Sequence, residues 1–218
     1  MTARGALATL FVLVWLAPAS AQPREPRFEL SAGGLFAGGY DLTGASANLV
    51  RNQSGGGDFA IFNTDTRAES APGFEVRAGW RLTPRFTVEG GLVVGRPRLA
   101  SRLSGDVEGA PDVTISEDLS QYIIDASVTA ALGSFSGGRI VPFVRAGAGH
   151  LRELHEDNTL LETGQAYHAG GGLTAWLGER RRLGLRIDGR MYFLRGGIDF
   201  GKSSRTVTTG AGALVFAF

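Results

Sequence analysis

The stretch TVTTGAGALVFAF, residues Thr206 to Phe218 at the end of the sequence, decides the fold. Side chains of a β-strand alternate between two faces, so Leu214, Phe216 and Phe218 share one face and small residues occupy the other. No charged residue follows Arg205. A soluble antiparallel strand usually has one wettable face, and this segment has none. We therefore predict that lipid covers one face, that packed small side chains cover the other, and that the segment closes a transmembrane β-barrel.

Residues 1–21 have the features of a secretory signal peptide. Arg4 is the only charged residue, and Ala6–Ala17 is an apolar stretch too short to cross a bilayer as a helix. Ala19 and Ala21 are small residues of the kind that precede a signal-peptidase cleavage site. An uncleaved N-terminal membrane anchor is the alternative interpretation.

Cleavage there predicts a mature chain that starts at Gln22, with a periplasmic lead-in over residues 22–26 and one barrel domain over residues 27–218. The sequence has no cysteine, which excludes a disulfide and a lipid-modified N-terminal cysteine. Basic and acidic residues nearly balance, at 22 against 21, so we expect no nucleic-acid partner.

Eight segments alternate between apolar and more polar residues with the period of a β-strand. They are residues 27–40, 73–82, 86–95, 118–132, 140–151, 160–177, 182–194 and 206–218. The long polar segments Asp41–Pro72 and Arg96–Glu117 alternate with short turns, as extracellular loops and periplasmic turns do in membrane barrels. Within the first of them, Asp58–Phe62 could extend the hairpin beyond the membrane. The pattern predicts an all-β fold, an eight-stranded antiparallel up-and-down transmembrane β-barrel.

Alternation alone does not say which face lies inside. A soluble lipocalin-like barrel would hold its apolar side chains inside, whereas a membrane barrel turns them outward. The closing strand without a wettable face favours the membrane barrel, as do aromatic residues near the strand ends and polar faces rich in Gly, Ala, Ser and Thr.

The charged residues of the strands then point into a lumen that side chains alone can fill. Buried ions must be paired, and the planar guanidinium of arginine binds carboxylates through two hydrogen bonds. We predict an arginine–carboxylate network that plugs the lumen. Its members are Glu29, Glu75, Arg77, Arg81, Glu89, Asp125, Arg145, Glu162, His168, Arg186, Asp188 and Arg190.

The signal peptide, eight alternating strands and terminal aromatic residue resemble the small outer-membrane β-barrel superfamily of Gram-negative bacteria. This group includes outer membrane protein A, outer membrane protein W and the opacity proteins. PFVRAGAGHLRELHE (Pro142–Glu156) and GQAYHAGGGLTAWL (Gly164–Leu177) look like strands five and six of its outer membrane β-barrel domain. The resemblance implies a place in the outer membrane, contact with its lipid, and insertion by the outer-membrane assembly machinery. It also implies that Leu214, Phe216 and Phe218 act as the assembly signal.

The candidates for catalysis are three histidines, His150, His155 and His168. None has a serine two residues later, as a site like that of lipid A deacylases requires, and His155 with its acidic neighbours resembles an omptin-like protease only weakly. Their scattered spacing predicts no metal site, and no motif predicts a cofactor.

We predict a monomeric, non-catalytic barrel that is structural or binds a ligand through its extracellular loops. Two alternatives stay open. One is a barrel enzyme that acts on lipid A or protein. The other is a secreted soluble lipocalin-like barrel that binds an apolar ligand.

Overall fold

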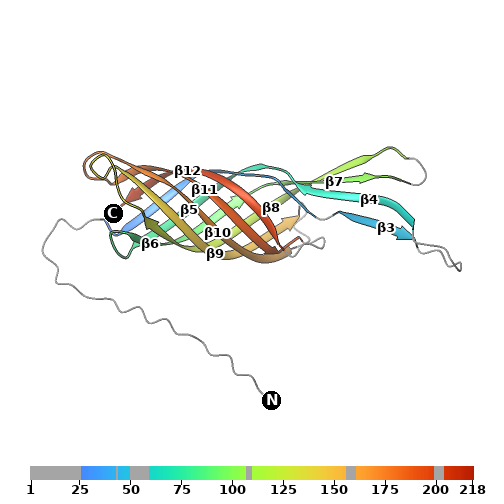
Figure 1. Ribbon diagram of the computed structural model, residues 1–218, viewed down its shortest axis with the longest axis horizontal. Helices are drawn as coiled ribbons and strands as arrows, with labels where there is room; N and C mark the ends of the chain where they lie inside the picture. Colours follow the sequence, from blue (N-terminus) through green and yellow to red (C-terminus); the bar gives the residue numbers. More distant parts are fainter. Residues whose placement is uncertain (1–25, 43, 50–58, 107–109, 156–160, 199–203) are drawn as a thin grey trace, which may run out of the picture.

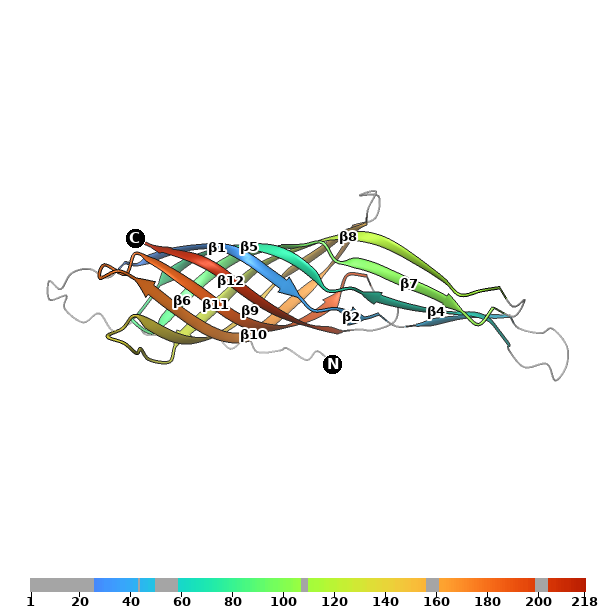
Figure 2. The same ribbon diagram turned by 90° about the horizontal axis from the view of Figure 1, so that it is seen from above.

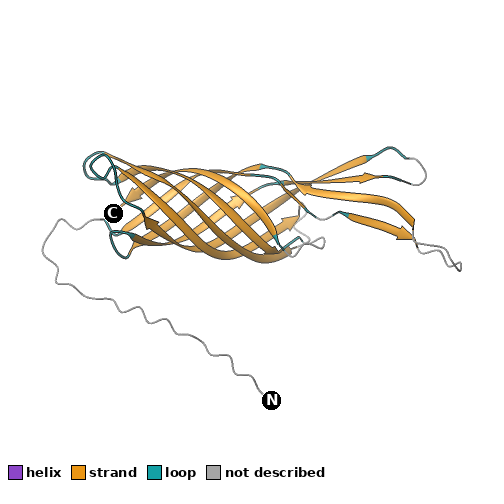
Figure 3. Ribbon diagram, viewed as in Figure 1, coloured by secondary structure: helices purple, strands orange, loops and turns teal. Residues whose placement is uncertain are grey.

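The computed structural model describes residues 26–42, 44–49, 59–106, 110–155, 161–198 and 204–218. The predicted signal peptide, its cleavage residues Ala19 and Ala21, and the lead-in up to residue 25 lie outside this part of the chain. Every regular element within it is a β-strand (Figure 3). None of these described residues forms a helix long and apolar enough to cross a membrane.

Eight antiparallel strands close into a barrel, which confirms the predicted fold class (Figure 1). They are β1 (Phe28–Ala37), β5 (Ala71–Arg81), β6 (Phe86–Gly95), β8 (Val113–Ala131), β9 (Ile140–His155), β10 (Leu161–Leu177), β11 (Leu183–Gly196) and β12 (Arg205–Ala217). Each strand is hydrogen-bonded to the next in this order, and β12 pairs with β1 to complete the cylinder. The topology is therefore up-and-down.

The closing strand β12 lies between β11 and β1 with the predicted orientation. Leu214, Phe216 and Phe218 point outward and are 47, 51 and 68% exposed, whereas Val215 is fully buried. The amide of Phe28 donates a hydrogen bond to the carbonyl oxygen of Phe218 at 3.0 Å, so the hydrogen bonds that join β12 to β1 continue as far as Phe218. Closure leaves no unpaired strand edge around the barrel, as a hydrocarbon environment requires.

Large apolar side chains cover the outside of the barrel. They include Phe28, Leu30, Phe36, Phe74, Trp80, Leu92, Ile124, Val128, Val144, Leu173, Leu185, Ile187, Met191, Phe193 and Phe216. A soluble monomer rarely exposes so large a continuous apolar surface, and hydrocarbon is the surrounding that suits it. The lipocalin-like alternative requires the same side chains inside, so the structure excludes it.

Beyond one end of the barrel the chain continues into a second sheet, which Figures 1 and 2 show as a long protrusion. This extracellular sheet consists of β2 (Tyr40–Asp41), β3 (Ala45–Leu49), β4 (Phe59–Ala68), β7 (Arg98–Ser104) and the start of β8. β2 and β3 pair with one edge of β4, and β7 pairs with the other. Residues Val113–Asp118 of β8 pair with β7 and end the sheet on that side.

The sheet corrects the prediction that Asp41–Pro72 and Arg96–Glu117 are loops. Only short breaks at residues 69–70 and 96–97 separate β4 from β5 and β6 from β7. Within the predicted extension at Asp58–Phe62, Phe59–Phe62 begin β4, and Asp58 lies outside the described residues. A hairpin that leaves the membrane keeps its backbone hydrogen bonds while water covers both faces. Its residues then need no apolar face, and the polarity of these segments was wrongly interpreted as loop.

The opposite end of the barrel carries three short turns, over residues 82–85, 132–139 and 178–182. The beginning of β1 and the end of β12 lie at this same end (Figure 1). Short turns and both strand termini mark the periplasmic end of a membrane barrel, so the protruding sheet is extracellular.

Candidate functional site

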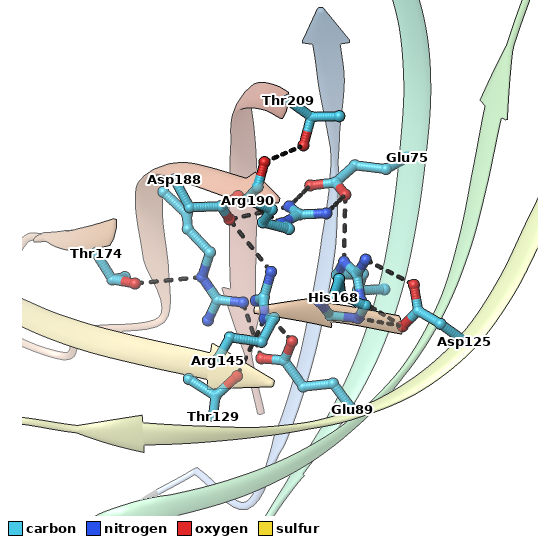
Figure 4. A network of polar contacts seen from close by, with 12 residues as sticks. Glu75, Glu89, Asp125, Thr129, Arg145, His168, Thr174, Asp188, Arg190 and Thr209 are labelled. Atoms are coloured by element: carbon cyan, nitrogen blue, oxygen red, sulfur yellow. Dashed lines mark hydrogen bonds and ion pairs between the residues drawn. The ribbon is translucent and has the colours of Figure 1, made fainter. Parts of the chain in front are cut away.

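The lumen holds a continuous chain of ions of alternating sign, and Figure 4 shows most of its members. Consecutive partners lie 2.5 to 3.2 Å apart, in the order Asp125, Arg77, Glu75, Arg190, Asp188, Arg145, Glu89, Arg186, Glu29 and Arg81. Five carboxylates therefore meet five guanidinium groups, and no net charge is left in the series. This balance is what allows so many ions to be buried together.

Two pairs in the chain have the fork-to-fork geometry that arginine favours. Arg77 donates to both oxygens of Asp125 at 2.8 and 2.9 Å, and Arg190 donates to both oxygens of Glu75 at 2.6 and 2.7 Å. Each pair joins strands that are not neighbours in the barrel, since β6 lies between the first two and β1 and β12 lie between the second two. The side chains of both pairs therefore reach across the lumen and fill it.

Threonine and tyrosine hydroxyl groups accept further hydrogen bonds from the arginine side chains. The Nε atoms of Arg145 and Arg186 donate to Thr129 and Thr174, each at 3.2 Å. Arg190 also lies 3.3 Å from the Tyr192 hydroxyl. Sequence reasoning missed these hydroxyls, although their positions share the strand faces of the predicted charged residues. Each of these contacts lowers the cost of burying a guanidinium group.

The structure brings the predicted lumen residues into this network except for Glu162. That residue lies near the extracellular end of β10, where its Oε2 atom is buried without a hydrogen-bond partner among the described residues. His168 stands at one end of the chain, with Nε2 3.6 Å from Asp125 Oδ1 and its ring 5.0 Å from that of Tyr192. Arg81 ends the other side and is partly open to the periplasm.

Apolar layers lie on both sides of the network. Trp176, Val215 and Ala217 form the periplasmic layer. The extracellular layer consists of Leu35, Val93, Ile123, Leu151, Ala166, Tyr192, Leu194 and Val207. Its cavity measures about 30 Å³. A single water needs about 10–15 Å³ on this measure, so the layer has no room for a solute.

The extracellular end of the lumen is here called the mouth. The buried carboxylate of Glu153 connects the residues around it and closes it. It accepts a hydrogen bond from the Ile198 amide at 2.8 Å and one from Gln121 at 2.9 Å, and it lies 3.4 Å from Arg205. The guanidinium of Arg205 lies over the ring of Tyr40, 5.5 Å from its centre. Burial, together with the negative charge of Glu153, raises the pKa of Tyr40 to about 12.

The closing contact at Glu153 was missed because the predicted fifth strand ended at residue 151, whereas β9 continues to His155. Arg205 was likewise left in the last loop. The signal was present in the alternation, because Glu153 shares its face with Arg145 and Arg205 shares its face with Val207. Extending each predicted strand by a few residues would have found the pair.

The three histidines lie in different parts of the barrel. His150 faces outward on β9, His155 bonds Glu117 at 2.6 Å at the extracellular rim, and His168 is buried in the lumen. In the described part of the chain, no group of three or more His, Asp or Glu side chains could hold a metal ion. The three histidines therefore do not form one cluster.

No protein-family model and no curated protein matches the chain. Solved structures do match. Neisserial surface protein A is 18% identical with a TM-score of 0.54, over 88% of this chain and 97% of that one. Outer membrane protein OprG from Pseudomonas aeruginosa is 12% identical with a TM-score of 0.50, over 89% of this chain and 97% of that one.

The outer membrane protease OmpT from Escherichia coli also matches, at 7% identity and a TM-score of 0.45, over 89% of this chain and 97% of that one. These values are too low to carry an argument about activity. At 18 and 12% identity, the first two structures establish the fold. The chain is a small eight-stranded β-barrel of the outer-membrane type. Its apolar outer surface suits a place in the outer membrane of a Gram-negative cell, where barrels of this type lie.

Proposed function

We propose that this barrel is a non-catalytic cell-surface protein that binds an extended segment of a partner protein along the edge of its extracellular sheet. The observation that carries the proposal is the edge formed by Val113–Asp118 of β8. β7 pairs with one side of this segment, and no described residue pairs with the other. An unpaired strand edge offers a row of free N–H and C=O groups to an added strand.

The side chains along this edge favour a partner with alternating apolar residues. Val113 and Ile115 point to one face and are 52 and 58% exposed, and Thr114 and Ser116 point to the other. Apolar cross-strand neighbours stabilise an added strand on the first face, and hydroxyl groups tolerate water on the second. The Glu117–His155 contact marks where the free edge ends at the barrel rim.

The rest of the molecule supports a passive scaffold. Within the described residues, ions and apolar side chains fill the lumen, which favours a scaffold over a channel. The separated histidines favour the non-catalytic function over an enzyme. A rigid barrel that holds a strand edge well outside the membrane is suited to capture a partner there.

Selection of unstructured peptides from a display library against the barrel in nanodiscs tests this proposal. We expect the selected peptides to alternate apolar and polar residues and to slow amide exchange in residues 113–118. Val113→Lys with Ile115→Lys should weaken their binding at least about tenfold, because the variant loses the apolar side chains against which the added strand packs. Thr114→Lys with Ser116→Lys is the matched control and should keep most of the affinity. Equal losses in both variants, or protection elsewhere, would refute edge binding.

The enzyme alternative has its own test. Purified barrel should release no product from lipid A or from unfolded protein substrates. Reproducible turnover that disappears in His155→Ala would overturn the non-catalytic proposal, whether or not the edge binds peptides.

A further inference from the structure

Six exposed arginines gather at the periplasmic end of the barrel. They are Arg27, Arg85, Arg139, Arg180, Arg181 and Arg182. Glu179 is the only acidic side chain in the described residues just before β1 and in the three short turns. The whole chain is nearly neutral, with 22 basic and 21 acidic residues, so this end concentrates positive charge that the composition conceals.

Backbone hydrogen bonds distribute four of these arginines around the circumference. Their carbonyl oxygens accept from the next strand at 2.7 to 2.8 Å: Arg27 from Arg81, Arg85 from Ala131, Arg139 from Trp176 and Arg182 from Ala217. These contacts lie at the β1–β5, β6–β8, β9–β10 and β11–β12 seams, which are alternate seams of the barrel. The arginines therefore form a collar around the barrel and not a single patch. We call these four residues the arginine collar.

The collar side chains have no acidic partner among the described residues. Nearby, Arg181 donates to the carbonyl of Gly137, which leaves its charge uncompensated. Two exposed arginines of the extracellular sheet behave differently, because Arg98 pairs with Asp118 at 3.1 Å and Arg102 pairs with Asp112 at 2.7 Å. The positive charge at the periplasmic end is thus available to an anion from outside the chain.

The collar borders directly on the surface that faces lipid. Leu82 and Phe86 flank Arg85 in the chain and are 54 and 47% exposed, and Phe135 in the turn before Arg139 is 63% exposed. An arginine at such a border lays its aliphatic stem along the apolar surface and places its guanidinium at head-group level. The guanidinium fork binds phosphate through two hydrogen bonds.

We propose that the arginine collar binds the phosphodiester head groups of anionic glycerophospholipids in the periplasmic leaflet around the barrel. Placement at alternate seams gives each part of the circumference a cation, which matches a ring of lipids better than one soluble ligand. Acyl chains then pack on the apolar surface while the phosphates meet the guanidinium groups. The inference is independent of the peptide-binding proposal, since it concerns the other end of the barrel.

Quenching of Trp80 fluorescence by lipids with brominated acyl chains measures the local lipid composition. Trp80 is 52% exposed on the outer surface near Arg27 and Arg81, whereas Trp176 is buried. In a Trp176→Phe background, with the predicted signal peptide and its Trp15 removed, Trp80 reports on this rim alone. We expect brominated phosphatidylglycerol to be enriched over brominated phosphatidylcholine roughly fivefold, the effect of about one arginine near an anionic phosphate.

Replacing the collar by glutamine at Arg27, Arg85, Arg139 and Arg182 should bring the enrichment close to one. The matched control carries the same charge change at the extracellular Arg67, Arg96, Arg98 and Arg102, and should quench like the parent. Heat-modifiable migration on a gel shows that a barrel has folded. If the collar variant lacks it, the salt dependence of the lipid preference in the parent still tests the proposal. An increase to about 0.5 M screens the charges and should abolish the preference.

The proposal would be overturned by equal quenching by both lipids in the parent, by loss of the preference in the control variant, or by a preference that resists salt. Addition of inorganic phosphate at constant ionic strength distinguishes a lipid head group from free phosphate as the bound anion. Displacement of the lipid by free phosphate would assign a soluble phosphate ligand. Collar-dependent binding to isolated cell-wall sacculi without any lipid preference would assign an anionic polymer, and it would also overturn the proposal.

Discussion

The guanidinium of Arg190 on β11 reaches across the lumen and donates to both carboxylate oxygens of Glu75 on β5, at 2.6 and 2.7 Å. Both side chains are almost fully buried. Since β1 and β12 lie between their strands, the pair ties two parts of the wall that backbone hydrogen bonds do not join. Removal of one partner leaves the buried network with one uncompensated charge, although Glu75 still contacts Arg77 and Arg190 still contacts Asp188.

The Arg190–Glu75 pair should therefore show strong coupling in a double-mutant cycle. Arg190→Leu or Glu75→Leu alone should lower the free energy of unfolding by about 3–5 kcal/mol, and the double variant should lose much less than the sum. Urea titration of the barrel in lipid vesicles measures this. The exposed pair Arg102–Asp112 is the control, and its removal should cost at most about 1 kcal/mol. Additive losses at Glu75 and Arg190 would contradict the assignment of a mutually dependent pair.

Conductance should reveal several seals in series. The ionic network and the extracellular apolar layer each block the lumen, so the parent should conduct no ions in planar bilayers. Glu75→Ala with Arg190→Ala should stay closed because the apolar layer remains, and Ile123→Ala with Leu194→Ala should stay closed because the network remains. The four changes combined with Trp176→Ala and Glu153→Ala, which open the periplasmic layer and the contact at the extracellular end, should give ion-conducting steps. Steps in either double variant would show that its remaining seals do not close the lumen.

Tyr40 should titrate late, because burial raises its pKa from the ordinary value of 10.0 to about 12. The folded state favours the neutral phenol, so the contribution of Tyr40 to stability is complete below pH 10 and is lost as the pH rises towards 12. The difference in phenolate absorbance between the parent and Tyr40→Phe gives the pKa. The urea midpoints of the two proteins should converge over the same pH interval. Titration near pH 10 would show that the mouth around Glu153 is open to water.

Three aromatic rings form a stack across the closing seam. Phe28 lies between Trp80 and Phe218, with ring centres at 6.4 and 6.2 Å. Phe28→Ala and Phe218→Ala should each destabilise the purified barrel, by about 0.5–1.5 kcal/mol for each stacked ring pair that the substitution removes. Only Phe218→Ala should also reduce the amount of barrel in the outer membrane, if Leu214, Phe216 and Phe218 are the assembly signal. Equal assembly of both variants in cells would contradict that role for Phe218.

Much of the barrel follows from local pattern. Alternation with a period of two assigns each strand residue to one of two faces, which is why Phe216 and Glu75 were predicted on the correct sides. The choice between the faces depended on three features: the closing strand Thr206–Phe218 without a wettable face, the aromatic residues near strand ends, and the polar faces rich in small residues. The polar segments around β4 and β7 were beyond this reasoning, because a strand with water on both faces has no apolar period.

The sequence by itself determined that the chain forms eight alternating strands with the charged faces turned inward, because face assignment depends only on neighbouring residues. Tertiary structure alone decided that Arg190 meets Glu75, that Arg77 meets Asp125, and that Glu153 closes the mouth. Those contacts are set by the registers that accumulate around a closed barrel, and each of them joins strands whose positions no local pattern encodes.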